Sequence, residues 1–348
     1  MWAKYVSTLS KNVKLLVVMT FLLLVSLIIV QISFFMTTIL FVYWALMWVI
    51  LVSLPFICAL LAVAFFTLFE RKLLGSIMLR KGPDKVGFMG ILQPFSDAGK
   101  LFCKEVVMPS RSNIIPYLLA PVFMLSISLA LWILYPFSSV SLLFIFGVLQ
   151  FLVTAGVSVY GVMVAGWSSN SKYSLLGSVR SIAQSISYEI SFSLIIFVVI
   201  GLSMSFFVQE IVTWQEGPLI FFFIYSIGLA LWMVCILAES HRAPFDFVEG
   251  ESELVSGFNV EYSGGLFAMI FMSEYSSMLF SSIFSACLFF GGSEILLSVL
   301  SIFFVFFFVW VRGSFPRMRY DKLMKLGWTV FIVIPLVYML TVLFVICS

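Results

Sequence analysis

The chain has 348 residues, of which 63% are hydrophobic and only 10% are charged. An ordinary soluble domain carries about 25% charged residues, because its outer shell must be largely polar. The composition therefore excludes a cytosolic enzyme, a secreted domain and a disordered chain, and it predicts a protein surrounded largely by lipid. The formal net charge of +3 is too small to indicate a nucleic-acid partner.

Apolar runs follow one another along the chain, most of them close to the ~20 residues that a helix needs to cross a bilayer. A first run at 15–35 follows a basic lead and has no small-residue cleavage site after it, so we interpret it as an uncleaved extra helix rather than a signal sequence. Because the later runs are hydrophobic on all sides, they indicate helices rather than the alternating strands of a barrel. The predicted fold class is all-α: a polytopic transmembrane helix bundle with eight conventional spans plus an extra N-terminal helix. The eight spans are expected at residues 48–69, 115–137, 142–166, 190–208, 218–238, 264–290, 295–311 and 326–347.

The charged residues gather in four windows between these runs. The windows 70–111, 172–189, 239–274 and 312–325 contain 29 of the 35 charged residues. When the spans are threaded alternately through the membrane, all 19 Lys and Arg residues fall on one side. This agreement with the positive-inside rule supports the predicted number of spans.

Several carboxylates lie inside or beside apolar spans, where a charge is costly and therefore marks a functional candidate. Glu189 is expected at the start of a helix, Glu239 at the end of one, and Glu274 within another. A structural ion pair with Lys or Arg is the alternative for each of them. The acidic segment 239–261 is interleaved with Phe and Leu side chains, which favours packing over a solvated loop, and it predicts a chain of coupled carboxyl groups.

Two basic stretches, around Arg71 and Arg80 and around Arg312, fall on the same side of the predicted membrane. Their simplest function is to bind anionic lipid headgroups, cardiolipin among them. The stretch around Asp97 has the pattern of an amphipathic helix that lies in the membrane interface.

Metal and nucleotide chemistry have no support in the sequence. The five cysteines include no C-x-x-C pair and the only histidine is His241, so haem with two histidine ligands is excluded and we predict no metal. A glycine fingerprint for nucleotides is also absent. Any redox chemistry is therefore expected on a bound molecule or in a partner subunit.

Four long motifs carry a resemblance to a known family. They are ERKLLGSIMLRKGPDKVGFMGILQPFSDAGKLF, AGWSSNSKYSLLGSVRSIAQSISYE, AESHRAPFDFVEGESELVSGFNVEY and RGSFPRMRYDKLM. In this order they resemble the subunit 1 family of respiratory NADH:ubiquinone oxidoreductase, complex I, in its mitochondrially encoded form. The resemblance covers residues 48–348, so we expect a membrane domain over 48–348 and an N-terminal extension over 1–47.

The resemblance implies a heel subunit of the mitochondrial inner membrane, with its basic loops on the matrix side and ubiquinone as substrate. The partners it implies are the peripheral-arm subunits at the quinone site, one of which holds the terminal iron–sulfur cluster, and the neighbouring small membrane-arm subunits. The residues that it assigns to the quinone tunnel are Arg71, Arg80, Asp97, Phe271 and Arg312. Those that it assigns to a proton path are Glu189, Glu239, Asp246, Glu249, Glu251, Glu253 and Glu274. Those that it assigns to charge balance or docking of the peripheral arm are Arg180, Arg242, Arg317 and Arg319.

The chain departs from the family pattern in three places. Residues 1–47 have no counterpart, Asp84 stands where the family mostly has Asn, and His241 stands where it usually has Asn. A polar loop residue is the simplest interpretation of His241, and a member of the proton network is the other. Two further functions stay open: the membrane subunit of a related proton-pumping hydrogenase, and a stand-alone proton or ion transporter.

Overall fold

The computed structural model describes residues 53–135, 145–215, 221–247 and 257–347. Within these ranges the secondary structure is helical and contains no strand. The expected extra helix at 15–35 lies outside the described residues, and so do Glu249, Glu251 and Glu253.

The described part contains seven helices that are long and apolar enough to cross a membrane, which confirms the all-α polytopic fold. They span Ser53–Ile77, Ile114–Leu134, Gly147–Ser168, Lys172–Ser203, Gly264–Phe289, Ile295–Ser314 and Tyr320–Phe344. The span expected at 218–238 is instead divided, within the described residues, into the short helix α7 (Phe221–Ile224) and the apolar helix α8 (Ser226–Glu239).

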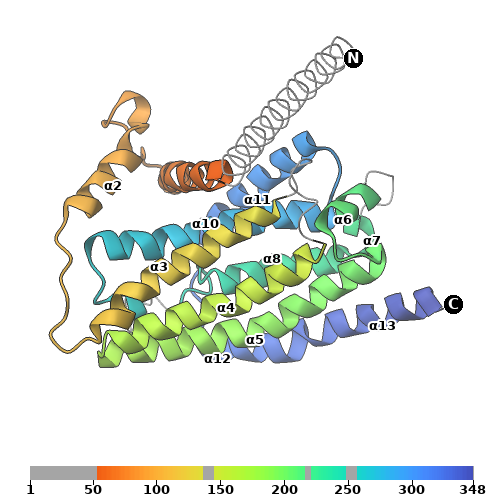
Figure 1. The fold of residues 1–348 in the computed structure, drawn as a ribbon. Coiled ribbons are helices and arrows are strands. Elements are labelled where there is room, and N and C mark those ends of the chain that lie inside the picture. Colours follow the sequence, from red (N-terminus) through yellow and green to blue (C-terminus); the bar gives the residue numbers. More distant parts are fainter. Residues whose placement is uncertain (1–52, 136–144, 216–220, 248–256, 348) are drawn as a thin grey trace, which may run out of the picture. The chain divides into compact units, whose positions relative to one another are not determined.

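Figure 1 labels the elements of this bundle. The long helices are α3 (Ile114–Leu131, continued by the 3-10 turn Trp132–Leu134), α4 (Gly147–Ser168), α5 (Lys172–Ser203), α10 (Gly264–Phe289) and α11 (Glu294–Ser314). The last span is built from α12 (Tyr320–Leu326), a π-helical segment (Gly327–Phe331) and α13 (Val333–Cys347). The shorter elements are the 3-10 turn Phe88–Gly90, α2 (Gln93–Cys103), α6 (Val208–Trp214) and the 3-10 turn Gly257–Asn259.

Helix α5 begins 18 residues earlier than the span expected at 190–208. The polar serines of this stretch stay helical because their hydroxyls donate to backbone carbonyls one turn back, which removes the cost of placing them among helices. Ser178 donates to Leu175 O at 3.0 Å, and Ser181 donates to Ser178 O at 2.7 Å. Glu189 therefore lies in the middle of a long helix, and the expectation that it starts one was wrong.

The helices pack around a core in which α3 contacts α4 and α10, α4 contacts α5, and α5 contacts α8 and α13 (Figure 1). Aromatic rings fill the centre. Phe192 of α5 stacks on Trp232 of α8 with ring centroids 4.3 Å apart, and Phe151 of α4 lies 4.1 Å from Phe284 of α10. Because lipid is as apolar as this core, it is the close van der Waals packing of these rings that fixes how the helices cross.

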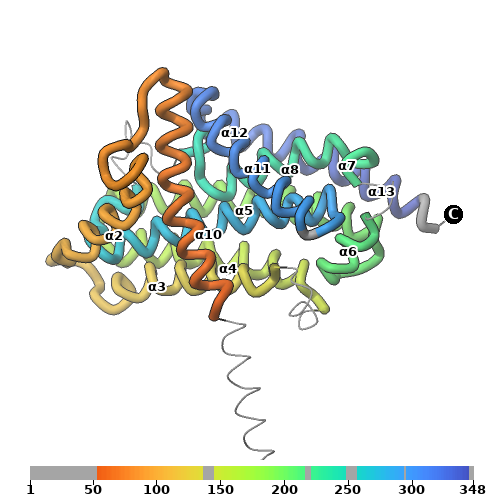
Figure 2. Tube along the Cα trace, turned by 90° about the horizontal axis from the view of Figure 1, so that it is seen from above, coloured from red at the N-terminus to blue at the C-terminus, as the bar shows by residue number. Residues whose placement is uncertain are grey.

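The Ser53–Ile77 helix crosses α10, as the red-orange segment in Figure 2 shows. Phe66 of this helix packs edge-on against Tyr275 of α10, with ring centroids 5.3 Å apart. One turn further along lies Glu70, which is thereby directed toward α10 rather than toward lipid.

Hydrogen bonds tie together the loops at one end of the bundle. Asn113 N donates to Ser168 O at 2.9 Å, and Tyr117 Oη donates to Glu261 O at 2.7 Å. Met318 N donates to Pro244 O at 3.0 Å. The first two bonds join the segments around Asn113, Ser168 and Glu261, and the third joins the loop after α8 to the segment before α12.

Candidate functional site

Glu70 is the centre of a buried ion cluster. Its side chain is only 7% exposed. Oε1 accepts a hydrogen bond from Arg312 Nη1 and a longer one, 3.5 Å, from Arg242 Nη1, while Tyr275 Oη donates to Oε2 at 2.6 Å. A buried carboxylate without partners would be strongly unfavourable, so the two guanidinium groups and the hydroxyl account for its stability here.

Four separate parts of the chain build this Glu70 cluster. Tyr275 lies in the middle of α10, Arg312 in the last turn of α11, and Arg242 in the loop after α8. The guanidinium of Arg242 also lies over the Tyr275 ring, 4.1 Å from its centroid, in a cation–π contact. The cluster therefore links the first described helix to α10, α11 and the loop that follows α8.

The loop that carries Arg242 is held from two sides. Arg242 N donates to Leu237 O at 3.2 Å, which closes the end of α8. Gln184 of α5 is buried, and its Nε2 donates to Ala238 O at 2.8 Å and to Phe245 O at 3.0 Å. A buried amide that bridges a helix end and a loop fixes both, because leaving either carbonyl unpaired would cost free energy.

Arg242 remains a cation in this setting. Burial acts to lower its pKa, but the neighbouring Tyr275 and Glu70 outweigh burial, so the pKa of Arg242 is raised above its ordinary value. Its Nη2 is buried and has no hydrogen-bond partner among the described residues. The guanidinium therefore carries donor capacity beyond the bond to Glu70.

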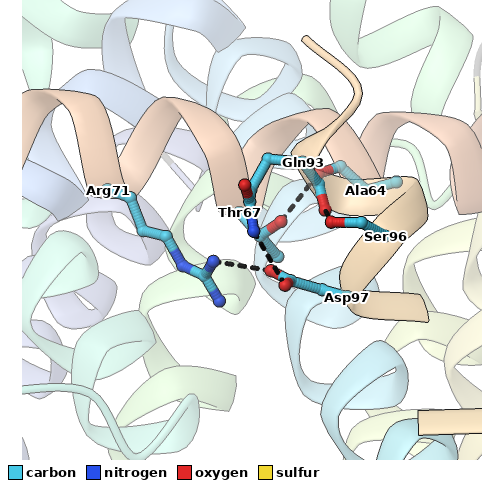
Figure 3. A network of polar contacts seen from close by, with 6 residues as sticks. All are labelled: Ala64, Thr67, Arg71, Gln93, Ser96 and Asp97. Atoms are coloured by element: carbon cyan, nitrogen blue, oxygen red, sulfur yellow. Dashed lines mark hydrogen bonds and ion pairs between the residues drawn. The ribbon is translucent and has the colours of Figure 1, made fainter. Parts of the chain in front are cut away.

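A second polar network joins the Ser53–Ile77 helix to α2 (Figure 3). Arg71 Nη1 donates to Asp97 Oδ2 at 2.6 Å, and Gln93 Nε2 donates to Asp97 Oδ1 at 2.9 Å. The side chains of Arg71 and Asp97 are 53% and 35% exposed, so this pair stays accessible. The amphipathic helix predicted around Asp97 is present as α2.

Three of the predicted carboxylates, Glu189, Glu239 and Glu274, line two neighbouring cavities. The larger, of about 100 Å³, is lined by Glu239, His241 and Glu274, and the smaller, of about 30 Å³, by Glu189, Glu239 and His241. Both exceed the ~15 Å³ that one water needs. Hydroxyls of both walls add hydrogen-bonding groups: Ser128, Thr154, Ser158, Ser273, Ser277 and Ser281 in the larger cavity, and Ser158, Ser181 and Ser185 in the smaller.

Glu239 and His241 border both cavities, whereas Glu274 borders only the larger and Glu189 only the smaller. Glu189 and Glu239 are close enough for their negative charges to repel each other. This repulsion makes it less favourable for both carboxyl groups to be ionised at once. The two cavities thus bring together carboxyl groups from α5, α8 and α10.

The carboxylate of Glu189 occupies space left by a glycine on the facing helix. A Cβ placed on Gly156 of α4 would lie 2.6 Å from Glu189 Oε1. Any side chain at position 156 would displace this carboxylate. The glycine thus gives Glu189 its place beside α4.

The remaining predicted residues lie in separate places. Asp246 accepts a hydrogen bond from Arg317 Nη2 at 3.2 Å, and a groove of about 400 Å³ is lined by Arg180, Phe247, Arg317, Met318, Arg319, Tyr320 and Asp321. Phe271 packs against Tyr275 at 4.6 Å between ring centroids, beside the Glu70 cluster. Arg80 lies in an exposed turn, where its Nη2 contacts Met78 Sδ at 2.7 Å, and the described contacts do not connect it to the cluster.

Sequence reasoning missed Glu70 and Tyr275. In the sequence, Glu70 is the first residue of the charged window 70–111, because it immediately precedes Arg71 and Lys72. In the structure, the helix continues past it to Ile77. The useful signal was its position four residues after Phe66, on the face that packs inward. Gly156 was also missed, because a single glycine in an apolar run gives no indication of what it faces.

The fold and the site define a polytopic helical membrane protein that buries carboxylates beside arginines. No group of three or more His, Cys, Asp or Glu residues within the described ranges could hold a metal ion.

Comparison with known proteins identifies the family. A family model described as NADH dehydrogenase matches residues 50–343. NADH-ubiquinone oxidoreductase chain 1 of Mytilus edulis is 58% identical over 83% of this chain and 94% of its own length. The proteins of the same name from Aedes aegypti and Branchiostoma lanceolatum are 51% and 45% identical, over 81% and 83% of this chain and 91% and 92% of their own lengths. The chain belongs to this NADH dehydrogenase family and is a membrane subunit of NADH:ubiquinone oxidoreductase, a multi-pass protein of the inner membrane.

Proposed function

We propose that this subunit forms part of the ubiquinone-access tunnel of the enzyme, and that its carboxylates couple quinone reduction to proton translocation. Reduction of ubiquinone to ubiquinol takes two electrons and two protons. The electrons come from an iron–sulfur cluster in a partner subunit, since we place no redox centre in this chain. Its own residues bind the quinone and move protons.

The pair of cavities joined at Glu239 is the observation that carries the proposal. Glu274 and Glu189 lie on opposite sides of this junction, and hydroxyl groups line both cavities. Carboxyl groups separated by small cavities with hydroxyl groups in their walls are what proton transfer over several steps requires, because each step must span only a water or two. Asp246, Glu249, Glu251 and Glu253 continue this path in the proposal.

We assign the tunnel wall to the side of the molecule that carries the Glu70 cluster. Arg71, paired with Asp97, remains more than half exposed, and Arg312 is 38% exposed while it contacts Glu70. Partly exposed guanidinium groups can donate to the carbonyl oxygens of a quinone headgroup. We propose that Phe271 supplies an apolar wall beside them and that Arg80 is a further tunnel residue.

We assign a docking role to the arginine groove. Arg180, Arg317 and Arg319 line it together with aromatic and acidic side chains. Arginine is enriched where protein surfaces meet, so we propose that the peripheral-arm subunits contact this face and that small membrane-arm subunits contact the apolar sides. The basic loops are placed on the matrix side, and cardiolipin is proposed at their edge. Residues 48–348 form the functional domain in this proposal, with 1–47 as an added segment.

A photoreactive ubiquinone analogue tests the tunnel assignment in the purified enzyme. Crosslinks are expected on peptides that contain Arg71, Asp97 or Phe271. The variant Glu189→Gln tests the proton path: it should lower ubiquinone reduction and proton uptake while NADH oxidation by an artificial acceptor stays normal. Crosslinks confined to other subunits would refute the tunnel, and normal turnover in Glu189→Gln would refute the role of that carboxylate.

A further inference from the structure

His241 occupies an unusual place at the wall between the two cavities. It is the only histidine in the sequence, and its backbone has a positive φ of 50°. This left-handed conformation turns the chain just after the end of α8 and directs the imidazole back toward Glu239 and both cavities. Its Nδ1 is buried and has no hydrogen-bond partner among the described residues.

An unpartnered nitrogen at this depth is costly unless a water or another polar molecule pairs with it. The two adjacent cavities, of about 100 and 30 Å³, are large enough to hold such waters. A neutral imidazole ring has one nitrogen that donates and one that accepts, so it can take up a proton at one nitrogen and release one at the other.

We propose that His241 is a proton relay between the two cavities. When Glu274 is protonated, its proton passes through a water of the larger cavity to the accepting nitrogen of the ring, and the other nitrogen releases its proton through a water of the smaller cavity to the carboxylate of Glu189. One N–H bond forms and one breaks, so the ring stays neutral overall and ends as the other tautomer. Rotation of the ring, or a proton passing in the opposite direction, restores the starting form.

The groups that face His241 fit this role. Glu239 on α8, Glu274 on α10 and Glu189 on α5 are the charged groups of the two cavities, while α3 and α4 contribute hydroxyl and apolar side chains. A relay must not retain the proton that it passes. Burial lowers the pKa of His241 to about 4, so the ring is neutral at rest.

Glu239 and His241 are thus two crossings of one wall. Ser158 is a third polar side chain on this wall, but Glu239 and His241 are the titratable groups that border both cavities, so a proton that moves between Glu274 and Glu189 through titratable groups passes at one of them. The inference rests on the proposed carboxylate path, and it adds that Glu239 is not the sole connection.

The test compares two substitutions in the assembled enzyme. His241→Asn and His241→Asp both suit a left-handed backbone, but only Asp can take up and release a proton. In the Glu239→Gln background, where His241 carries the remaining turnover, His241→Asn should lower ubiquinone reduction and proton uptake at least fivefold further, with artificial-acceptor activity unchanged, and His241→Asp should recover at least half of that loss. No further loss with His241→Asn, or equal further losses with both substitutions, would overturn the relay. If His241→Asn does not assemble, His241→Gly takes its place, since glycine adopts this φ freely.

The double variant separates this inference from the proposed function. Glu239→Gln alone should leave about a tenth of the turnover, carried by His241, and addition of His241→Asn should remove it. If the double variant keeps wild-type turnover, the carboxylate path itself is wrong. If Glu239→Gln impairs turnover and His241→Asn adds nothing, only the relay is wrong.

Discussion

The substitution Gly156→Ala displaces the Glu189 carboxylate without changing its chemistry. The added Cβ would lie 2.6 Å from Glu189 Oε1, whereas ordinary van der Waals contact begins at 3.4 Å, so the carboxylate must shift by about 0.8 Å. Alanine is also the better helix former, by about 1 kcal/mol in a helix interior. Because the obstructing atom is the end of a flexible side chain, α4 should stay folded.

The expected result is a loss of function without a loss of assembly. A displacement of nearly 1 Å at a reacting group can cost up to about a hundredfold in rate, and proton transfer through water is more tolerant, so we expect ubiquinone reduction to fall about tenfold. The assay measures ubiquinone reduction and proton uptake in vesicles that contain the enzyme, with NADH oxidation by an artificial acceptor as the measure of assembly.

Gly147→Ala is the matched control for Gly156→Ala. It lies on the same helix, and among the described residues its Cβ would meet Val208 Cγ2 at 3.2 Å and Leu134 Cδ2 at 3.8 Å, with no carboxylate within 4 Å. It should therefore leave both activities near the wild-type level. Wild-type ubiquinone reduction in Gly156→Ala would show that the position of Glu189 does not matter, and an equal loss in both variants would show that any crowding of α4 is sufficient.

The other predictions concern the ion clusters and pH. Glu70→Gln removes the counter-charge of Arg242, whose side chain is 13% exposed, and should lower the stability of the subunit by about 3 kcal/mol. The loss should appear as a lower temperature at which the subunit dissociates from the purified enzyme. An unchanged temperature would contradict a stabilising role of the buried pair. Asp97→Asn breaks the exposed pair with Arg71 and should change the stability of the subunit in the enzyme by less than about 1 kcal/mol. It should nevertheless weaken labelling by a quinone analogue. A large loss of stability with unchanged labelling would refute a role of this pair in quinone binding. The pKa of His241 is lowered to about 4 from 6.5, so the unfolded chain takes up the proton first: stability is complete above about pH 6.5 and should fall by about 2 kcal/mol between pH 7.5 and 5. His241→Asn should reduce that acid loss, and an identical pH profile in the variant would exclude His241 as its cause.

The membrane fold could be predicted because it depends on composition and run length. Lipid demands about 20 apolar residues per span, and runs of this length are visible without any knowledge of packing. The start of α5 was placed at 190 rather than 172 because serines look polar in a sequence, while in a helix they satisfy themselves on backbone carbonyls. The composition of 218–238 likewise gives no clear indication that this span is divided into α7 and α8.

The candidate site was only partly predictable, since it depends on which helices meet. Glu189, Glu239 and Glu274 could be selected because a carboxylate in an apolar run is rare, and the structure brings them to two adjoining cavities. Glu70 and Tyr275 become partners only when two helices 205 residues apart in sequence cross. The roles proposed for Gly156 and His241 depend on the groups that face them in the folded chain. These are Glu189 for Gly156 and the cavity carboxylates for His241.

The most direct test of the carboxylate path is proton uptake per electron pair in Glu239→Gln. Glu239 borders both cavities, so loss of its titrating group should lower ubiquinone reduction and proton uptake about tenfold. Glu210→Gln is the matched control, because this exposed carboxylate lies in the first turn of α6, away from the cavities. The account predicts a loss in Glu239→Gln and wild-type behaviour in Glu210→Gln. Wild-type turnover and proton uptake in Glu239→Gln would contradict it.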